Sequence, residues 1–261
     1  MTNHYRLIWF QHFHKAAGSF IVRLALYNQE KLYPQHKNGN PINTDGTLIR
    51  LWEMSNEELT HFVDHCENEG ITFVATEWGA PNFNLLASDP RVIIISCLRN
   101  PLERFVSNFN FDFRSGYTHC QSIEEYVNSS GSFTMFNYYC RILSQHNENP
   151  EPITINQFEQ AKSSLSLFNY WVILEEQKTF WGLNQFLGWK KQAMRQNQAR
   201  SKIRRILKSI EKGNFTLNQK QYKEKPNPQF VQLFREFNKF DYQLYAEAKT
   251  NNLAPSYLNF Q

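Results

Sequence analysis

The chain has 261 residues, of which 41% are hydrophobic and 15% aromatic, a composition that can bury a sizeable core and argues against disorder. No apolar run approaches the roughly 18 residues that span a bilayer, and the amino terminus has no signal-peptide pattern, so we expect one cytoplasmic domain over residues 1–261, with no membrane partner. The formal net charge of +4 conceals a basic segment, residues 190–225, with a net charge of +10 against −6 for the rest, which predicts an anionic partner.

Short apolar runs alternate with amphipathic segments along the chain. In chain order they predict a strand at 6–10, a helix at 19–28, strands at 71–76 and 92–98, helices at 101–113, 123–127, 133–144 and 154–165, a weaker strand at 170–174, and helices at 175–187 and 228–249. The strands are apolar on both faces, which is typical of a parallel sheet covered by helices. We therefore predict an α/β fold with a central parallel sheet flanked by helices, in which ligands bind beyond the carboxyl ends of the strands.

The first strand leads directly into a short loop before the first helix. This loop contains Lys15, Ala16, Ala17, Gly18 and Ser19. At a helix N-terminus, backbone N–H groups and the helix dipole favour an anion, and small side chains let it approach closely. The loop is not a Walker A motif, because its lysine precedes its single glycine. The sequence allows either a phosphate-binding loop or a plain strand-to-helix turn.

A second candidate anion site follows the third strand. Arg99 ends that strand, and Asn100 is suited to cap the next helix. Ser107 lies two turns into the helix, so an arginine and a hydroxyl converge where a phosphate can be held. The alternative is that Arg99 simply pairs with Glu103.

Together, these two stretches resemble a known family, the sulfotransferases that use 3′-phosphoadenosine 5′-phosphosulfate (PAPS). The pattern similar to their 5′-phosphosulfate loop is Phe10-x-His12-x-x-Lys15-x-x-Gly18-Ser19. The pattern similar to their 3′-phosphate strand and helix is Leu98-Arg99-Asn100-Pro101-x-Glu103-Arg104-x-x-Ser107. Weaker similarity continues at 137–143 and 170–187. The chain most resembles the carbohydrate type, which includes the heparan sulfate 2-O-sulfotransferases and their bacterial relatives.

The resemblance implies a P-loop nucleotide-kinase-like sulfotransferase fold and transfer of a sulfuryl group from PAPS to a hydroxyl of a small molecule or carbohydrate. It gives Lys15 the role of stabilising charge on the leaving phosphate oxygen. The implied PAPS contacts are Lys15, the backbone of Ala16, Ala17 and Gly18, the Ser19 hydroxyl, Arg99 and Ser107. No metal is implied, and no pattern of His, Cys or carboxylate residues in the sequence suggests one.

Three residues are candidates for the general base that takes the acceptor's proton. Glu77 ends the second strand, where the resembling family often has a histidine, and it suits this role if Trp78 and Phe83 raise its pKa. The alternative is an exposed glutamate at a strand end. The other candidates are His12, at a position commonly histidine in the family loop, where it more often supports the loop, and His14, which replaces a frequent proline.

The basic segment 190–225 is expected to cover the nucleotide or the acceptor. Within it, Arg195 and Arg200 are candidate contacts to the PAPS phosphates. The alternative is a solvated basic helix, since isoleucine and leucine recur at helical spacing between residues 203 and 210.

Two other functional classes stay open. A small-molecule or nucleotide kinase would share the parallel sheet, but the sequence lacks a Walker A lysine and a recognisable acidic Mg²⁺ site. A nucleic-acid-binding module would use the basic segment, but it would not need Lys15, Arg99 and Ser107 at strand ends. We expect no nucleic acid partner.

Overall fold

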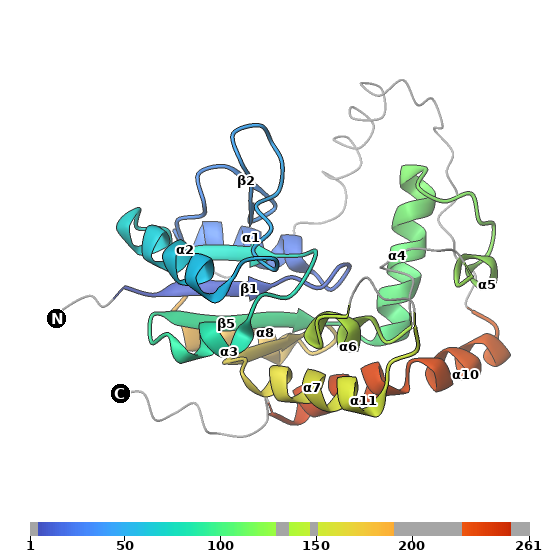
Figure 1. Cartoon of the computed structure of the whole chain (residues 1–261). Helices are drawn as coiled ribbons and strands as arrows, with labels where there is room; N and C mark the ends of the chain where they lie inside the picture. The colour runs from blue at the N-terminus through green and yellow to red at the C-terminus, as the bar shows by residue number, and fades with distance from the viewer. Residues whose placement is uncertain (1–4, 129–135, 147–150, 191–225, 252–261) are drawn as a thin grey trace.

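The computed structural model describes residues 5–128, 136–146, 151–190 and 226–251. Within these ranges, a sheet of four parallel strands in the order β4-β1-β5-β6 forms the centre (Figure 1). The strands are β1 (Leu7–Gln11), β4 (Phe73–Thr76), β5 (Val92–Leu98) and β6 (Tyr170–Ile173), and a separate antiparallel pair is formed by β2 (His36–Lys37) and β3 (Asn40–Pro41). The predicted α/β fold with a central parallel sheet is confirmed.

Helices connect and cover the strands. They are α1 (Gly18–Tyr27), α2 (Asn56–Asn68), α3 (Phe83–Ser88), α4 (Pro101–Ser115), α5 (Ile123–Tyr126), α6 (Tyr138–Leu143), α7 (Ile155–Ser166), α8 (Gln177–Leu187), α10 (Pro228–Phe237) and α11 (Lys239–Asn251). In the described part of the chain, none of them combines the length and apolarity needed to cross a membrane.

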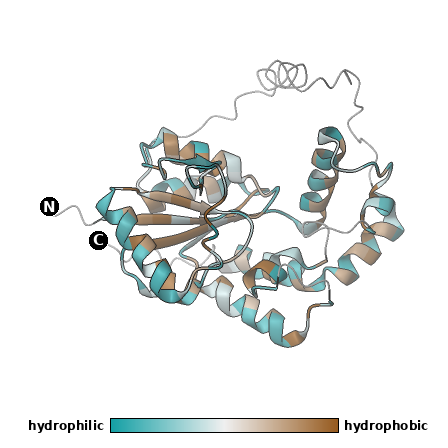
Figure 2. Ribbon diagram, turned by 45° about the horizontal axis from the view of Figure 1, so that its top comes forward, coloured by the Kyte–Doolittle hydropathy of each residue, from teal (hydrophilic) through white to brown (hydrophobic). Residues whose placement is uncertain are grey.

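The sheet separates two apolar cores. Leu7 and Trp9 of β1 pack in the core that α2, α3, α6, α7 and α11 cover, whereas Ile8 and Phe10 pack in the core under α1 and α8. In Figure 2 the strands are hydrophobic, and the helices around them carry both hydrophobic and hydrophilic residues. Burial on both faces is the physical reason that the strands are continuous apolar runs.

A third apolar cluster lies beyond the carboxyl edge of the sheet. Phe105 and Phe109 of α4 pack there with Tyr126 of α5 and with Phe230 and Phe234 of α10. In Figure 1, α4, α5 and α10 stand together past the strand ends. This cluster fixes α4 as a border of the edge at which the candidate anion sites lie.

Helix α2, the short helix α3 and the β2–β3 pair were not predicted. A capping box begins α2: the Ser55 hydroxyl accepts the N–H of Glu58, and the Glu58 carboxylate accepts the N–H of Ser55. Leu59 and Phe62 then follow on the buried face. This pattern of a serine, a glutamate three residues later and an apolar face is visible in the sequence and could have identified α2.

The predicted helix at 228–249 is two helices. Asn238 ends α10 by donating its side-chain amide to the carbonyl of Phe234, and it accepts the N–H of Asn137 at 2.8 Å. Asparagine competes with the helical backbone in this way, which favours helix ends. The helix predicted at 133–144 begins, within the described residues, at Tyr138, after Asn137 in the left-handed conformation.

Candidate functional site

The three strand ends of the predicted site meet at one edge of the sheet. Gln11, at the end of β1, is in register with Thr76 of β4 and with Ser96 of β5. Because β4 and β5 lie on opposite sides of β1, the chain leaves β1 at a topological switch point, where α/β sheets bind ligands. The segments after β1, β4 and β5 therefore surround a common position.

The loop after β1 has the backbone of an anion site. Lys15 and Ala17 adopt the left-handed conformation, with φ of 64° and 70°. Ala17 is the N-cap of α1 and provides no side-chain acceptor, and the first turn of α1 holds no acidic residue. Among the described residues, the N–H groups of Gly18 and Ser19 donate to no acceptor. A helix N-terminus whose N–H groups have no acceptor and which carries no acidic side chain favours an anion at Gly18 and Ser19.

Position 18 requires glycine because the His12 ring leaves no room for a side chain. A Cβ atom on Gly18 would lie 1.8 Å from Cδ2 and Nε2 of the His12 ring. That ring stacks on Phe10, with centroids 5.6 Å apart, and its side chain is only 5% exposed. His12 is therefore packed between β1 and the start of α1, where it supports the loop.

Replacing Gly18 by alanine is expected to lower the free energy of unfolding by about 2 to 3 kcal/mol, because the His12 ring must move from its packed position. Denaturant unfolding measures this loss. Gly46→Ala is the control: Gly46 has a φ of 85° but open space around it, so only backbone strain of about 1 kcal/mol is expected there. Equal stability of the two variants would contradict the role given to the contact.

Lys15 lies against α4. Its Nζ atom is 4.0 Å from the centroid of the Phe111 ring. Burial, repulsion by Arg114 and repulsion by Arg99 lower the pKa of Lys15 to about 8, although nearby carboxylates oppose the shift. A lysine held among other cations is stabilised by any anion that enters, so its position suits a phosphate ligand.

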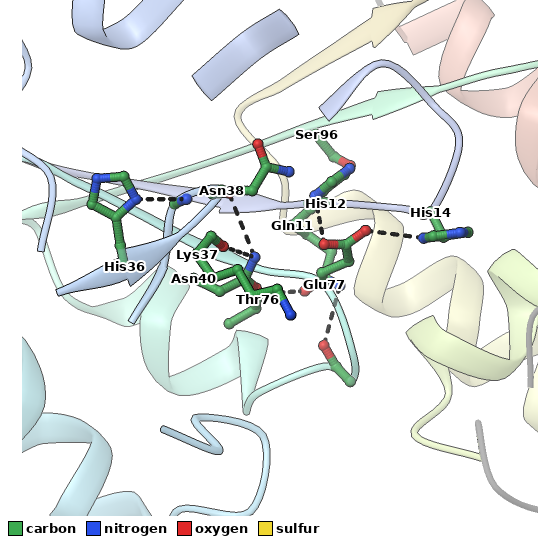
Figure 3. Close-up of polar contacts among 12 residues, drawn as sticks. Gln11, His12, His14, His36, Lys37, Asn38, Asn40, Thr76, Glu77 and Ser96 are labelled. Carbon is green, nitrogen blue, oxygen red and sulfur yellow. Dashed lines mark hydrogen bonds and ion pairs between the residues drawn. The ribbon is translucent and has the colours of Figure 1, made fainter. Parts of the chain in front are cut away.

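Glu77 lies between the two candidate histidines (Figure 3). Its Oε1 is 3.0 Å from His14 Nδ1, its Oε2 is 3.4 Å from His12 Nδ1, and its side chain is 14% exposed. Burial raises the pKa of Glu77, but the contacts with His12 and His14 outweigh burial and hold that pKa far below its usual range. The condition under which Glu77 would suit the role of base, a pKa raised by Trp78 and Phe83, is therefore not met, because the two histidines favour the ionised carboxylate.

His14 and Lys15 meet the same aromatic ring. The His14 ring makes an edge contact with the Phe111 ring, with centroids 6.0 Å apart, and Lys15 Nζ lies over that same ring. When His14 Nδ1 donates to Glu77, Nε2 is the nitrogen that can accept a proton. The structure thus brings an imidazole, a carboxylate and a cation to one place.

Residues that the sequence did not single out hold the turn after Glu77. The Gln11 amide donates to the carbonyl of Gly79 at 3.1 Å and accepts from the Thr76 hydroxyl at 2.8 Å. A Cβ atom on Gly79 would lie 2.4 Å from Cγ of Trp52, which packs on the turn. A buried polar residue at the end of an otherwise apolar strand, such as Gln11, is the sequence signal for this support.

The strand end at Arg99 forms the other side of the edge. Asn100 caps α4, with its side chain accepting the N–H groups of Leu102 and Glu103, as predicted. Arg99 contacts Glu103 at 3.4 Å, which is the alternative pairing that the sequence allowed. Ser107 follows Glu103 by one turn of α4, and Phe111 follows by another. Glu103, Ser107 and Phe111 therefore lie on one face of α4. Arg99 contacts this face at Glu103, and Lys15 contacts it at Phe111.

Two expected contacts, Arg195 and Arg200, lie outside the described residues, as does the rest of the basic segment after Lys190. In the described ranges, no group of three or more His, Cys, Asp or Glu side chains is arranged to hold a metal ion.

Comparison with known proteins identifies the family. A family model described as the sulfotransferase family matches residues 1–246, a stretch that contains the loop at Lys15, the carboxylate of Glu77 and the strand end at Arg99. No curated protein shows a significant match to the chain. The chain thus belongs to the sulfotransferase family.

Proposed function

We propose that the protein transfers the sulfuryl group of PAPS to a hydroxyl group of an acceptor. The observation that carries this proposal is the meeting of Lys15 with the His14–Glu77 pair, beside the uncapped N-terminus of α1. Sulfuryl transfer needs a cation at the leaving phosphate and a base at the attacking hydroxyl, and this arrangement supplies both.

The described residues fit a nucleotide with phosphates on both its 5′ and 3′ sides. The backbone N–H groups of Gly18 and Ser19, with Lys15, suit the 5′-phosphate. Arg99 and Ser107 suit the 3′-phosphate. The present contact of Arg99 with Glu103 is a partly exposed ion pair at 3.4 Å, which contributes on the order of 0 to 1 kcal/mol, so a doubly charged phosphate competes with it successfully.

The proposed mechanism assigns one role to each side chain. His14 Nε2 takes the proton of the acceptor hydroxyl as its oxygen attacks sulfur, and a new S–O bond forms. The S–O bond to the 5′-phosphate breaks, and the electron pair remains on the phosphate oxygen, where Lys15 Nζ offsets the charge. Glu77 orients the His14 ring and stabilises its protonated form. This role agrees with a carboxylate that stays ionised better than a role as the base itself.

The acceptor is proposed to be a carbohydrate or a small hydroxylated molecule. Support comes from the two loop patterns, which are similar to those of carbohydrate sulfotransferases, including the heparan sulfate 2-O type. Mass spectrometry for an added sulfuryl group, across a panel of oligosaccharides and hydroxylated metabolites, identifies the acceptor class.

Selective stabilisation by the desulfated product, 3′-phosphoadenosine 5′-phosphate (PAP), is the expected result of a thermal shift experiment. At about 100 times its dissociation constant, PAP should add about 2.7 kcal/mol to the free energy of unfolding. Adenosine 5′-phosphate, which lacks the 3′-phosphate, should stabilise much less, and Arg99→Ala should reduce the difference between the two ligands. Stabilisation by ATP with Mg²⁺ would favour a kinase, and stabilisation by an oligonucleotide would favour a nucleic-acid-binding module. Either result, with no effect of PAP, overturns the proposal.

A further inference from the structure

Two adjacent tyrosines at the start of α6 contact the two sides of the proposed PAPS site. The Tyr138 hydroxyl accepts the backbone N–H of His14 at 3.0 Å. The Tyr139 hydroxyl donates to the carbonyl of Arg99 at 2.7 Å and accepts the N–H of Arg99 at 3.1 Å. Both tyrosines are buried in the core that α6 shares with α7 and α11. Neighbouring residues of one helix therefore hold the loop after β1 and the end of β5.

The position of α6 is set by α11. Asn137 begins α6 without a side-chain cap, and the buried carboxylate of Asp241 takes the place of one. Its two oxygens accept the N–H groups of Tyr139 at 3.0 Å and Cys140 at 2.9 Å. Anionic acceptors at a helix N-terminus are stabilising, so Asp241 fixes the helix turn that carries the two tyrosines.

The contact between α6 and the α10–α11 junction is reciprocal. The Asn137 side-chain carbonyl accepts the N–H groups of Phe240 and Asp241 at 3.2 and 3.3 Å. Its amide donates to the carbonyl of Phe237 at 2.9 Å. Each of the two helices thus satisfies backbone groups of the other, and α6 cannot shift without breaking several buried hydrogen bonds.

A second connection runs from α11 to the same strand end. The Tyr245 hydroxyl donates to Glu175 Oε2 at 2.8 Å, and Glu175 Oε1 accepts the N–H of Asn100 at 2.9 Å. Tyr245 follows Asp241 by one turn, so both lie on one face of α11. The peptide groups of Arg99 and Asn100 are therefore held through Tyr139 and through Glu175, and both connections lead back to α11.

We infer that Tyr138 and Tyr139 are positioning residues with separable effects. Tyr139 sets the direction in which Arg99 leaves β5 and so determines selectivity for a ligand with a 3′-phosphate. Tyr138 sets the backbone at His14 and so determines the rate of group transfer. The inference rests on the proposed function, because it assigns the two anion sites to the two ends of PAPS.

The test compares phenylalanine variants of the two tyrosines, in the full-length chain, with PAP and adenosine 5′-phosphate as probes in calorimetry. Tyr139→Phe, which removes both hydrogen bonds to the Arg99 backbone, should weaken PAP binding about tenfold and change adenosine 5′-phosphate binding less than about threefold. Tyr138→Phe should leave the ratio of the two affinities within about threefold and lower kcat about tenfold with PAPS and an acceptor. Tyr5→Phe is the control, since it removes a hydroxyl bonded to the Ile71 carbonyl at the amino end of the sheet.

The results that would overturn the inference differ from the result that would overturn the proposed function. If both variants weaken the two probes equally, the tyrosines have only a structural role and the inference is wrong. If Tyr139→Phe does not fold, Tyr245→Phe, which acts on Asn100 through Glu175, must reduce the preference for PAP, and an unchanged preference overturns the inference. A wild-type chain that does not distinguish PAP from adenosine 5′-phosphate instead overturns the proposed function, and the inference with it.

Discussion

Turnover should fall by about two to four orders of magnitude when His14 is replaced by glutamine, because the variant lacks the nitrogen that we propose takes the acceptor's proton. PAP affinity should stay within about threefold, since this loss removes a step of the chemistry and not an anion contact. Single-turnover kinetics with PAPS measure the first quantity, and calorimetry with PAP measures the second. His61→Gln, on the exposed side of α2, is the matched control and should retain full activity.

Glu77→Gln tests whether His14 and Glu77 act as a unit. Glutamine has no charge to stabilise the protonated His14 ring, so turnover should again fall by about two or more orders of magnitude. Because the two residues support the same proton transfer, the double variant should be hardly slower than His14→Gln alone. If turnover in the double variant instead fell by the product of the two single-variant losses, His14 and Glu77 would act independently. Substantial turnover in His14→Gln, with none in Glu77→Gln, would make Glu77 the base.

Lys15→Ala should lower turnover by about 100 to 1,000 fold, the usual effect of removing a donor from a developing oxyanion. Lys162→Ala is a matched control: Lys162 on α7 also lies over a phenylalanine ring, that of Phe158, at 5.7 Å. Loss of activity in both variants, or in neither, would contradict a specific role of Lys15.

The same lysine is expected to give PAP binding a distinct pH dependence. Burial and nearby arginines lower the pKa of Lys15 to about 8, so in the free protein its charge is present below pH 8 and is lost as the pH rises through 8. A bound anion favours the charged form, so wild-type affinity for PAP should fall above pH 8. Lys15→Arg should bind PAP with little change across this range, because arginine stays protonated. Titration calorimetry at several pH values distinguishes the two profiles.

The sequence was sufficient to predict those elements whose pattern depends only on neighbouring residues in the chain. The strands β1 and β5 are apolar on both faces because both are covered, and that pattern is local. The N-terminal asparagine cap of α4 and the small-residue turn before α1 are local as well. Local patterns therefore located the candidate site at Lys15, Glu77 and Arg99, and the match to the sulfotransferase family supports the same class of protein.

The electrostatics of Glu77 could not be predicted from neighbours in the sequence. Trp78 and Phe83 are close along the chain, but His12 and His14, which lower its pKa, come from the loop after β1. The same holds for Lys15, whose pKa depends on arginines from the end of β5 and from α4. Pairing of parallel strands brings these groups together. Their proximity therefore cannot be predicted from the residue spacing within any one segment.

The helix pair α6–α11 has a consequence for how the protein becomes functional during its synthesis. Asn137 and Asp241 are about a hundred residues apart in the chain, so the bonds that fix Tyr138 and Tyr139 form only after α11 has left the ribosome. The sheet and its loops, by contrast, are complete once Ile173 has emerged. A nascent chain can therefore pair its strands before α11 completes the core on one face of the sheet and fixes the helix turn that carries the two tyrosines.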